Sequence, residues 1–300
     1  MMYYETLRLL WDREWENGLR LKLQARTEKD EPTAAFFFQS LDGTGAPSPN
    51  SANYRRQFRT SDFTAALTFQ PGVTWINTKQ RRIAANNDAP IFSLSHTVGL
   101  YEQFDKTHTY NFTEAGIYKR FWMASWGKID TYLKGGAQWN KVPFPLLSMP
   151  AANLSYIMED YTFNLINNME FLNDRYASLM VSWDMNGKIL NRIPLIKKLK
   201  WREYIGCNVL WGTLTSKNNP FLAKNANDPR LFYFPGHFNA DGSFDYLSTV
   251  MDKKKPYVEV IAGIHNIFKI FHIEYVRRLT YVDNPDTDKW GIRFMFRVTF

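Results

Sequence analysis

The side chains best suited to metal binding or nucleophilic chemistry are few. The chain contains five histidines and one cysteine. They fall on different expected strands and loops, without the short, regular separations that metal ligands need, so we expect no metal site. A lone cysteine also excludes a disulfide framework, and Cys207 shares an apolar face with Ile205 and Val209, as a small hydrophobe does. The histidines are His96, His108, His237, His265 and His272.

A serine and a histidine are sequence neighbours at Ser95 and His96. Adjacent side chains on a strand point to opposite faces, so these two cannot act as nucleophile and base within regular strand geometry. No Gly-rich phosphate-binding loop is present either. The sequence therefore predicts a protein without catalysis and without a cofactor.

The charge balance is basic, with 37 lysines and arginines against 29 acidic residues, a net charge of +8. Such an excess suits a partner that is either nucleic acid or anionic lipid. Nucleic-acid binding surfaces combine clustered cations with stacking aromatics, whereas these cations alternate with apolar residues. We therefore expect no nucleic-acid partner.

Alternation of apolar and polar residues is the dominant pattern and predicts β-strands. In residues 19–26, for example, leucine and alanine alternate with arginine, lysine and glutamine. The same period of two recurs in residues 63–70, 92–100, 176–184 and 290–300, and no helical pattern of comparable quality is present. An antiparallel all-β fold follows.

Strand length, turns and loops indicate a transmembrane β-barrel. The mean hydropathy is −0.40, and no stretch reaches the about 18 apolar residues of a membrane helix. Tight turns are expected at 16–18, 172–174 and 265–267, and long polar loops at 40–60 and 215–255, which is the outer-membrane pattern. Tryptophans lie near strand ends, as in interfacial belts: Trp11, Trp183, Trp201, Trp211 and Trp290. A soluble secreted β-sandwich that acts as a binding module is the alternative.

About twelve strands are expected, within the known range for such barrels. Turns 16–18 and 265–268 can face the same side only if an even number of strands separates them, and the expected set contains an odd number. One strand is therefore in excess or missing, and residues 29–60 or 139–160 are where we expect the error. The expected strands are 4–12, 19–28, 61–70, 91–100, 109–120, 126–138, 162–171, 175–184, 199–212, 256–264, 269–280 and 289–300.

Several sequence blocks, in order, resemble a Bacteroidota outer-membrane family of unknown function, domain 5686. The blocks are KVPFPLL at 141–147, EFLNDRYASL at 170–179, LNRIPLIKKLK at 190–200, PYVE at 256–259, GIHNIFK at 263–269, RRLTY at 277–281 and WGIR at 290–293. The last strands are also distantly similar to BamA-type assembly barrels, although the Arg-Gly-Phe loop signature of those proteins is absent from 215–255.

The resemblance implies that residues 1–300 are one outer-membrane β-barrel domain, the C-terminal part of a longer protein. Full-length relatives carry a carboxypeptidase-regulatory-like domain before the barrel. The implied location is the cell outer membrane, and the family has no established activity to transfer. We expect a structural, transport or envelope-assembly role. The expected partners are outer-membrane lipid and lipopolysaccharide, the barrel-assembly machinery and other envelope proteins. An outer-membrane lipid-modifying enzyme is the second alternative.

Charged residues that alternate with the apolar positions of the strands should point to the inside of this barrel, and most of them are basic. In a water-filled lumen such a lining would favour anions. The other possibility is that Glu259 and Glu274 pair with Arg278, Arg293 and their neighbours and fill a narrow, closed barrel. The lumen-lining residues are Arg8, Arg20, Lys22, Arg26, Glu259, Glu274, Arg278, Arg293 and Arg297.

The final strand has the form of an assembly signal, an amphipathic strand with a terminal aromatic that folding machinery reads by strand pairing. Its apolar positions are Trp290, Ile292, Phe294, Phe296, Val298 and Phe300. Phe300→Asp should therefore reduce the amount of protein inserted in the outer membrane, measured by membrane fractionation. Normal insertion of this variant would contradict the signal.

Overall fold

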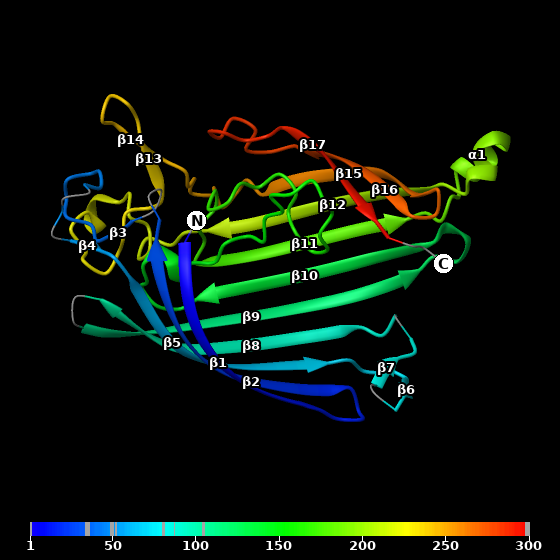
Figure 1. Ribbon diagram of the computed structural model, residues 1–300, viewed down its shortest axis with the longest axis horizontal. Coiled ribbons are helices and arrows are strands. Elements are labelled where there is room, and N and C mark those ends of the chain that lie inside the picture. Colours follow the sequence, from blue (N-terminus) through cyan, green and yellow to red (C-terminus); the bar gives the residue numbers. More distant parts are fainter. Residues whose placement is uncertain are drawn as a thin grey trace.

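The computed structural model describes residues 2–33, 37–48, 51, 53–79, 82–86, 88–103 and 106–297. Its main element is an antiparallel sheet of 11 strands in which neighbours in sequence order are hydrogen-bonded (Figure 1). The all-β, antiparallel prediction is thereby confirmed. The strands are β1 (Met2–Glu14), β2 (Leu19–Pro32), β5 (Phe58–Phe69), β8 (Ile91–Gln103), β9 (Lys106–Trp122), β10 (Lys128–Gln138), β11 (Arg175–Asp184), β12 (Arg202–Thr213), β15 (Tyr257–Ile267), β16 (Phe271–Arg278) and β17 (Trp290–Phe296).

The remaining elements are short and lie in the connections. Three two-stranded sheets are formed by β3 (Phe38–Gln39) with β4 (Tyr54–Arg55), β6 (Trp75–Asn77) with β7 (Arg82–Ala84), and β13 (Gly236–Phe238) with β14 (Phe244–Tyr246). The α-helix α1 spans Pro194–Leu199. In the described part of the chain, no helix has the length and apolar character to cross a membrane.

The strand predicted at 162–171 is wrong, as is the tight turn at 172–174. These residues belong to the connection from β10 to β11, outside the main sheet. The surplus strand is therefore here and not in 29–60 or 139–160. Without it, an even number of strands, from β2 to β15, separates the turns after β1 and after β15, and both turns lie at the same end of the sheet.

We call this end the short-turn end. It also carries the β6–β7 hairpin and the connection that contains α1, on the right of Figure 1. The opposite, long-loop end carries connections 33–57, 139–174 and 214–256. Most tight turns and long loops are thus segregated as the sequence predicted, but two connections at the short-turn end are longer than a tight turn, and β8 joins β9 at the long-loop end through two residues only.

The sheet is curved but is not closed within this chain. Among the described residues, β1 pairs only with β2, and β17 pairs with β16 and with a single bridge from Ile157 to Phe294. The predicted closed barrel is therefore not formed by these strands alone, because its two edge strands are not paired with each other.

The outer face of the sheet is apolar and exposed. Phe63, Leu94, Val98 and Leu133 are each about half exposed, and most of their neighbours along the strands are polar. A soluble sheet of this size would bury such a face against another layer. No second layer covers it in the part of the chain that the structure describes.

Candidate functional site: the segment held on the inner face

Residues 139–174, which we call the inner segment, fold back over the inner face of the sheet (Figure 1). Their apolar side chains are buried there: the Phe163 ring lies 5.8 Å from that of Tyr257, and the Phe171 ring 5.9 Å from it. Phe163, Ile166 and Phe171 form one core cluster with Leu210 of β12 and Tyr257 of β15. The inner segment thus fills the space that a water-filled lumen would occupy.

Glu259 on β15 binds the backbone of the inner segment. Its carboxylate accepts hydrogen bonds from the amide of Asn164 at 2.9 Å and from the amide of Leu165 at 3.1 Å. Asn208 Nδ2 and the Tyr257 hydroxyl donate to the same carboxylate, each at 2.8 Å. The Glu259 side chain is completely buried. With Asn164 Nδ2, which donates at 3.3 Å, five donors compensate its charge, as burial of a carboxylate requires.

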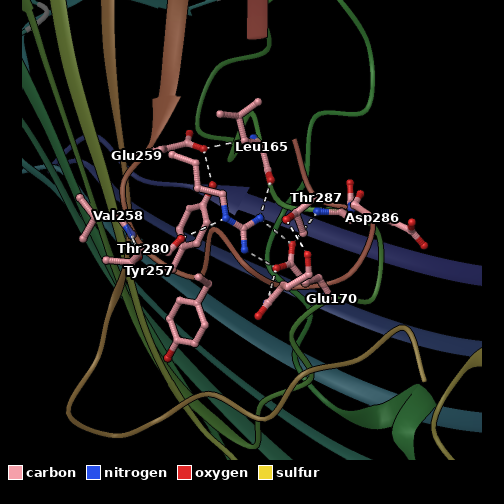
Figure 2. Close-up of polar contacts among 12 residues, drawn as sticks. Leu165, Glu170, Tyr257, Val258, Glu259, Thr280, Asp286 and Thr287 are labelled. Atoms are coloured by element: carbon pink, nitrogen blue, oxygen red, sulfur yellow. Dashed lines mark hydrogen bonds and ion pairs between the residues drawn. The ribbon is translucent and has the colours of Figure 1, made fainter. Parts of the chain in front are cut away.

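Arg278 on β16 and Glu170 on the inner segment form a buried ion pair, with Arg278 Nη2 2.5 Å from Glu170 Oε1. Their relative exposures are 1% and 2%. Arg278 Nη1 also donates to the Leu165 carbonyl at 3.0 Å, and Asn284 Nδ2 donates to Glu170 at 2.8 Å. Figure 2 draws the contacts that converge on Glu170, Leu165 and Glu259.

Arg293 on β17 is the fourth buried charged residue at these contacts. We call Glu170, Glu259, Arg278 and Arg293 together the latch. The Arg293 guanidinium donates to the Asn164 carbonyl and is buried. The predicted pairing of Glu259 and Glu274 with Arg278 and Arg293 is wrong in its partners. Glu259 instead holds amide groups, Arg278 pairs with Glu170, and Glu274 is hydrogen-bonded to His265 Nε2 at 2.9 Å.

The predicted inward charges on β1 and β2 lie far from the latch in sheet order. Arg20 pairs with Asp12 at 2.5 Å, and Arg26 pairs with the buried Asp62 at 2.7 Å. Arg8 and Lys22 are exposed, opposite Arg26 and Asp12 in the strand register. Three of the predicted lumen residues, Glu259, Arg278 and Arg293, are therefore buried and hold the inner segment, whereas the four on β1 and β2 are more accessible and lie near the β1 edge.

The residues of the predicted assembly signal lie on or after β17. Trp290, Ile292 and Phe296 are exposed. Phe294 accepts and donates backbone hydrogen bonds with Met158 and Tyr156 of the inner segment. Val298 and Phe300 lie outside the described residues. Arg297 is exposed and lies 3.5 Å from Asp160.

A polar chamber of about 320 Å³ remains between the inner segment and the sheet. His265, Glu274 and His272 line it, and the Tyr204 ring stacks on His265 at 4.4 Å. Ser182 lies on the same wall. No three His, Cys, Asp or Glu side chains of the described residues are grouped so that they could hold a metal ion.

A family model described as the C-terminal domain of a family of unknown function, DUF5686, matches residues 1–221. The chain belongs to the DUF5686 family. The matched part of this DUF5686 chain contains the whole inner segment and ends before β15, β16 and β17. No curated protein matches the chain.

Among solved structures, the chain is similar to CdiB from Acinetobacter baumannii, with 10% sequence identity and a TM-score of 0.36. The similarity covers 98% of this chain and 49% of CdiB, so the DUF5686 chain spans about half the length of that protein. A likeness at this TM-score carries no argument about the function of the DUF5686 chain.

Sequence reasoning missed three residues of this site, two on the inner segment and one on β12. Glu170 and Asn164 fall within the strand expected at 162–171, and Asn208 stands in no distinctive pattern. One available signal was Glu170 itself, an acid within an apolar stretch of the DUF5686 chain (MEFL at 169–172), since a carboxylate in such surroundings needs a cationic partner.

At the long-loop end, connections 33–57 and 214–256 pack on the start of the inner segment and form a hydrophobic cap with it. Phe38, Val142, Phe144 and Phe232, from three different connections, are almost completely buried in one cluster. Polar contacts join the same loops: Asn218 Oδ1 accepts from the Val142 amide at 2.9 Å. The space is therefore closed from this end by the loops and from within by the inner segment.

The cap should loosen in acid. Burial raises the pKa of Asp228, but hydrogen bonds from Lys141 and the Arg230 amide outweigh burial and hold that pKa below its ordinary value. A lowered pKa stabilises the folded loop above the unfolded-state pKa of about 4, and this stabilisation is lost as pH falls through the folded-state pKa. Hydrogen exchange of residues 223–231, corrected for intrinsic rate, should accelerate between pH 6 and pH 3. Asp228→Asn should weaken that dependence, whereas Asp252→Asn, at an exposed site, should preserve it.

Proposed function

We propose that this chain forms the wall and the internal plug of an outer-membrane β-barrel that is closed to passive diffusion. The observation that carries the proposal is the division of one sheet into an exposed apolar outer face and an inner face that holds the inner segment through buried charges. The apolar outer face suits contact with lipid, and the inner face, with its buried charges, suits a sealed interior.

Among the described residues the free edge of β1 has no strand partner and that of β17 is bridged only at Phe294, which supports completion of the wall by further strands. β1 is 13 residues long, and its aromatic and aliphatic side chains, among them Tyr4, Leu7 and Trp11, are exposed. A long, exposed edge strand invites pairing with another strand. In this proposal the chain is one part of a larger barrel.

The role that fits a plugged barrel is structural support, gated transport or assembly of the envelope, without catalysis. Three buried side chains of the sheet, Glu259, Arg278 and Arg293, hold the plug, so passage of cargo requires release of the latch. The proposed location is the outer membrane. Its lipid, its lipopolysaccharide, the barrel-assembly machinery and envelope proteins are the proposed partners.

Reconstitution of the refolded protein into planar bilayers tests the proposal. We expect a detergent requirement for a monodisperse sample, stable incorporation into lipid, and no steady conductance. A sample that is monodisperse without detergent would contradict the membrane location. Persistent anion-selective channels would contradict the closed interior and support an open lumen.

The second candidate is a lipid-modifying enzyme, and the chamber is the observation that favours it. His265 and Glu274 are hydrogen-bonded there, and Ser182 lines the same wall. A carboxylate that is hydrogen-bonded to a histidine can orient that histidine as a base toward a nucleophile. The chamber lies on the inner face, however, opposite the apolar face that would meet lipid. Turnover of phospholipid or lipopolysaccharide that is lost in Ser182→Ala and His265→Ala would favour the enzyme.

A further inference from the structure

The connection between β11 and β12 combines exposed apolar side chains with a dense positive charge. We call residues 187–201 the basic loop. It contains five cations and no acidic residue, and Leu195 on α1 is 78% exposed. Three more aliphatic side chains of the loop, Ile189, Ile193 and Leu199, are about half exposed. Its cations are Lys188, Arg192, Lys197, Lys198 and Lys200.

The basic loop is held in place, so this exposure is a feature of its fold. Glu203 accepts hydrogen bonds from the amides of Ile189, at 2.9 Å, and Leu190. Asn266 Nδ2 donates to the Lys200 carbonyl at 2.7 Å, which fixes the end of α1 against the turn after β15. Gly187 has φ of +77°, and a Cβ there would meet the Asn191 side chain and the Trp201 carbonyl.

Its surroundings have the composition of a membrane interface. The Trp126 and Trp183 rings lie 6.0 Å apart, and Lys188 Nζ lies 5.3 Å from the Trp126 ring centroid. In the adjoining turn Phe268 is 79% exposed, next to Lys269. Tryptophan and lysine together are typical of the level at which lipid headgroups meet the hydrocarbon. Figure 1 shows α1 beyond the strand ends, at the short-turn end of the sheet.

We infer that the basic loop binds anionic phospholipid in the periplasmic leaflet of the outer membrane. The inference rests on the proposed function, in which the short-turn end faces the periplasm. Exposed aliphatic side chains enter the acyl boundary while the cations meet phosphate groups, as in other amphipathic, interface-bound segments. Lipopolysaccharide occupies the opposite leaflet, beside the long-loop end. The anion that the loop meets is therefore a phospholipid such as phosphatidylglycerol.

Trypsin cleavage of the wild-type protein in lipid nanodiscs tests this binding, because both faces of a nanodisc are accessible. We compare discs of phosphatidylcholine with discs containing about one-third phosphatidylglycerol. Each lysine near an anionic surface contributes about a fivefold gain in binding, so cleavage after Lys198 should be at least about tenfold slower with phosphatidylglycerol. Cleavage after Lys254, at the long-loop end, serves as the internal control and should not change. High salt should remove the protection.

Two matched variants complete the experiment. Lys197→Gln with Lys198→Gln should strongly reduce the lipid dependence of cleavage after Arg192, because two of the five cations are lost, whereas Lys253→Gln with Lys254→Gln should retain it. Equal cleavage rates in the two kinds of nanodisc would overturn the inference while leaving the barrel intact. Protection in both kinds of disc that is insensitive to salt would also overturn it, in favour of a protein or apolar contact. A protein that remains monodisperse without detergent would overturn the barrel itself.

Discussion

Arg278→Met is expected to lower the free energy of unfolding by about 3–5 kcal/mol. The substitution retains most of the side-chain volume but leaves Glu170 buried without its cation, and breaking one partner of a buried ion pair carries a cost of that size. It also frees the Leu165 carbonyl from its hydrogen bond. Urea titration in lipid vesicles, followed by tryptophan fluorescence, measures the change. In planar bilayers the same variant should open transiently, because the inner segment is released more often.

Arg277→Met is the matched control, since Arg277 precedes Arg278 on β16 and is exposed. It should change the unfolding free energy by less than about 1 kcal/mol, as removal of a single exposed charge does. Adding Glu170→Gln to Arg278→Met removes the orphaned charge and should recover more than half of the loss. If Arg278→Met and Arg277→Met were equally stable, the latch would not hold the inner segment.

Alternation predicted the sheet because each strand faces two different environments. In β2, leucines lie on one face, and Arg20, Lys22 and Arg26 lie on the other. The strands expected at 109–120 and 126–138 are β9 and β10 of the main sheet. Here Glu114, on the inner face, pairs with Lys134 of the neighbouring strand, so the two charges compensate each other across strands.

Alternation wrongly predicted a strand in the inner segment, because a segment that packs against the inside of the sheet also buries alternate side chains. Phe163 and Leu165 are buried and alternate with polar residues, as in a strand. Their contacts are with Tyr257, Ile261 and Val276 on the inner face, not with lipid. The alternation of apolar and polar residues does not show whether the apolar side chains contact the inner face of the sheet or lipid.

The odd or even position of a charged residue along its strand likewise predicted the face on which it lies, but not the group that it binds. The carboxylate of Glu259 binds amides 94 and 95 residues away in the sequence. Such contacts depend on where the connection from β10 to β11 folds, and strand period carries no information about that path. The candidate site was therefore predictable as a set of inward charges, and its assembly into a latch was not.

The second large effect is expected from Leu133→Arg, on the outer face near the middle of β10. Leu133 is opposite Ile117 of β9 and Leu179 of β11, so its neighbours across both strands are apolar. An arginine at the bilayer midplane of a barrel costs about 2–4 kcal/mol, and one near the interface about 0–1 kcal/mol. Ile129→Arg, on the same face and strand but close to the short-turn end, is the depth control.

Comparison of these two variants shows whether the outer face of the sheet contacts lipid or water. In lipid vesicles, Leu133→Arg should lower the unfolding free energy by at least about 2 kcal/mol more than Ile129→Arg, because the penalty depends on depth in the hydrocarbon. If the face met water, the arginines would replace an exposed leucine and a partly exposed isoleucine at little cost, and surface substitutions of that kind stay within about 0.5 kcal/mol. Equal, small effects would therefore place the outer face in water, and a depth-dependent difference places it in the membrane.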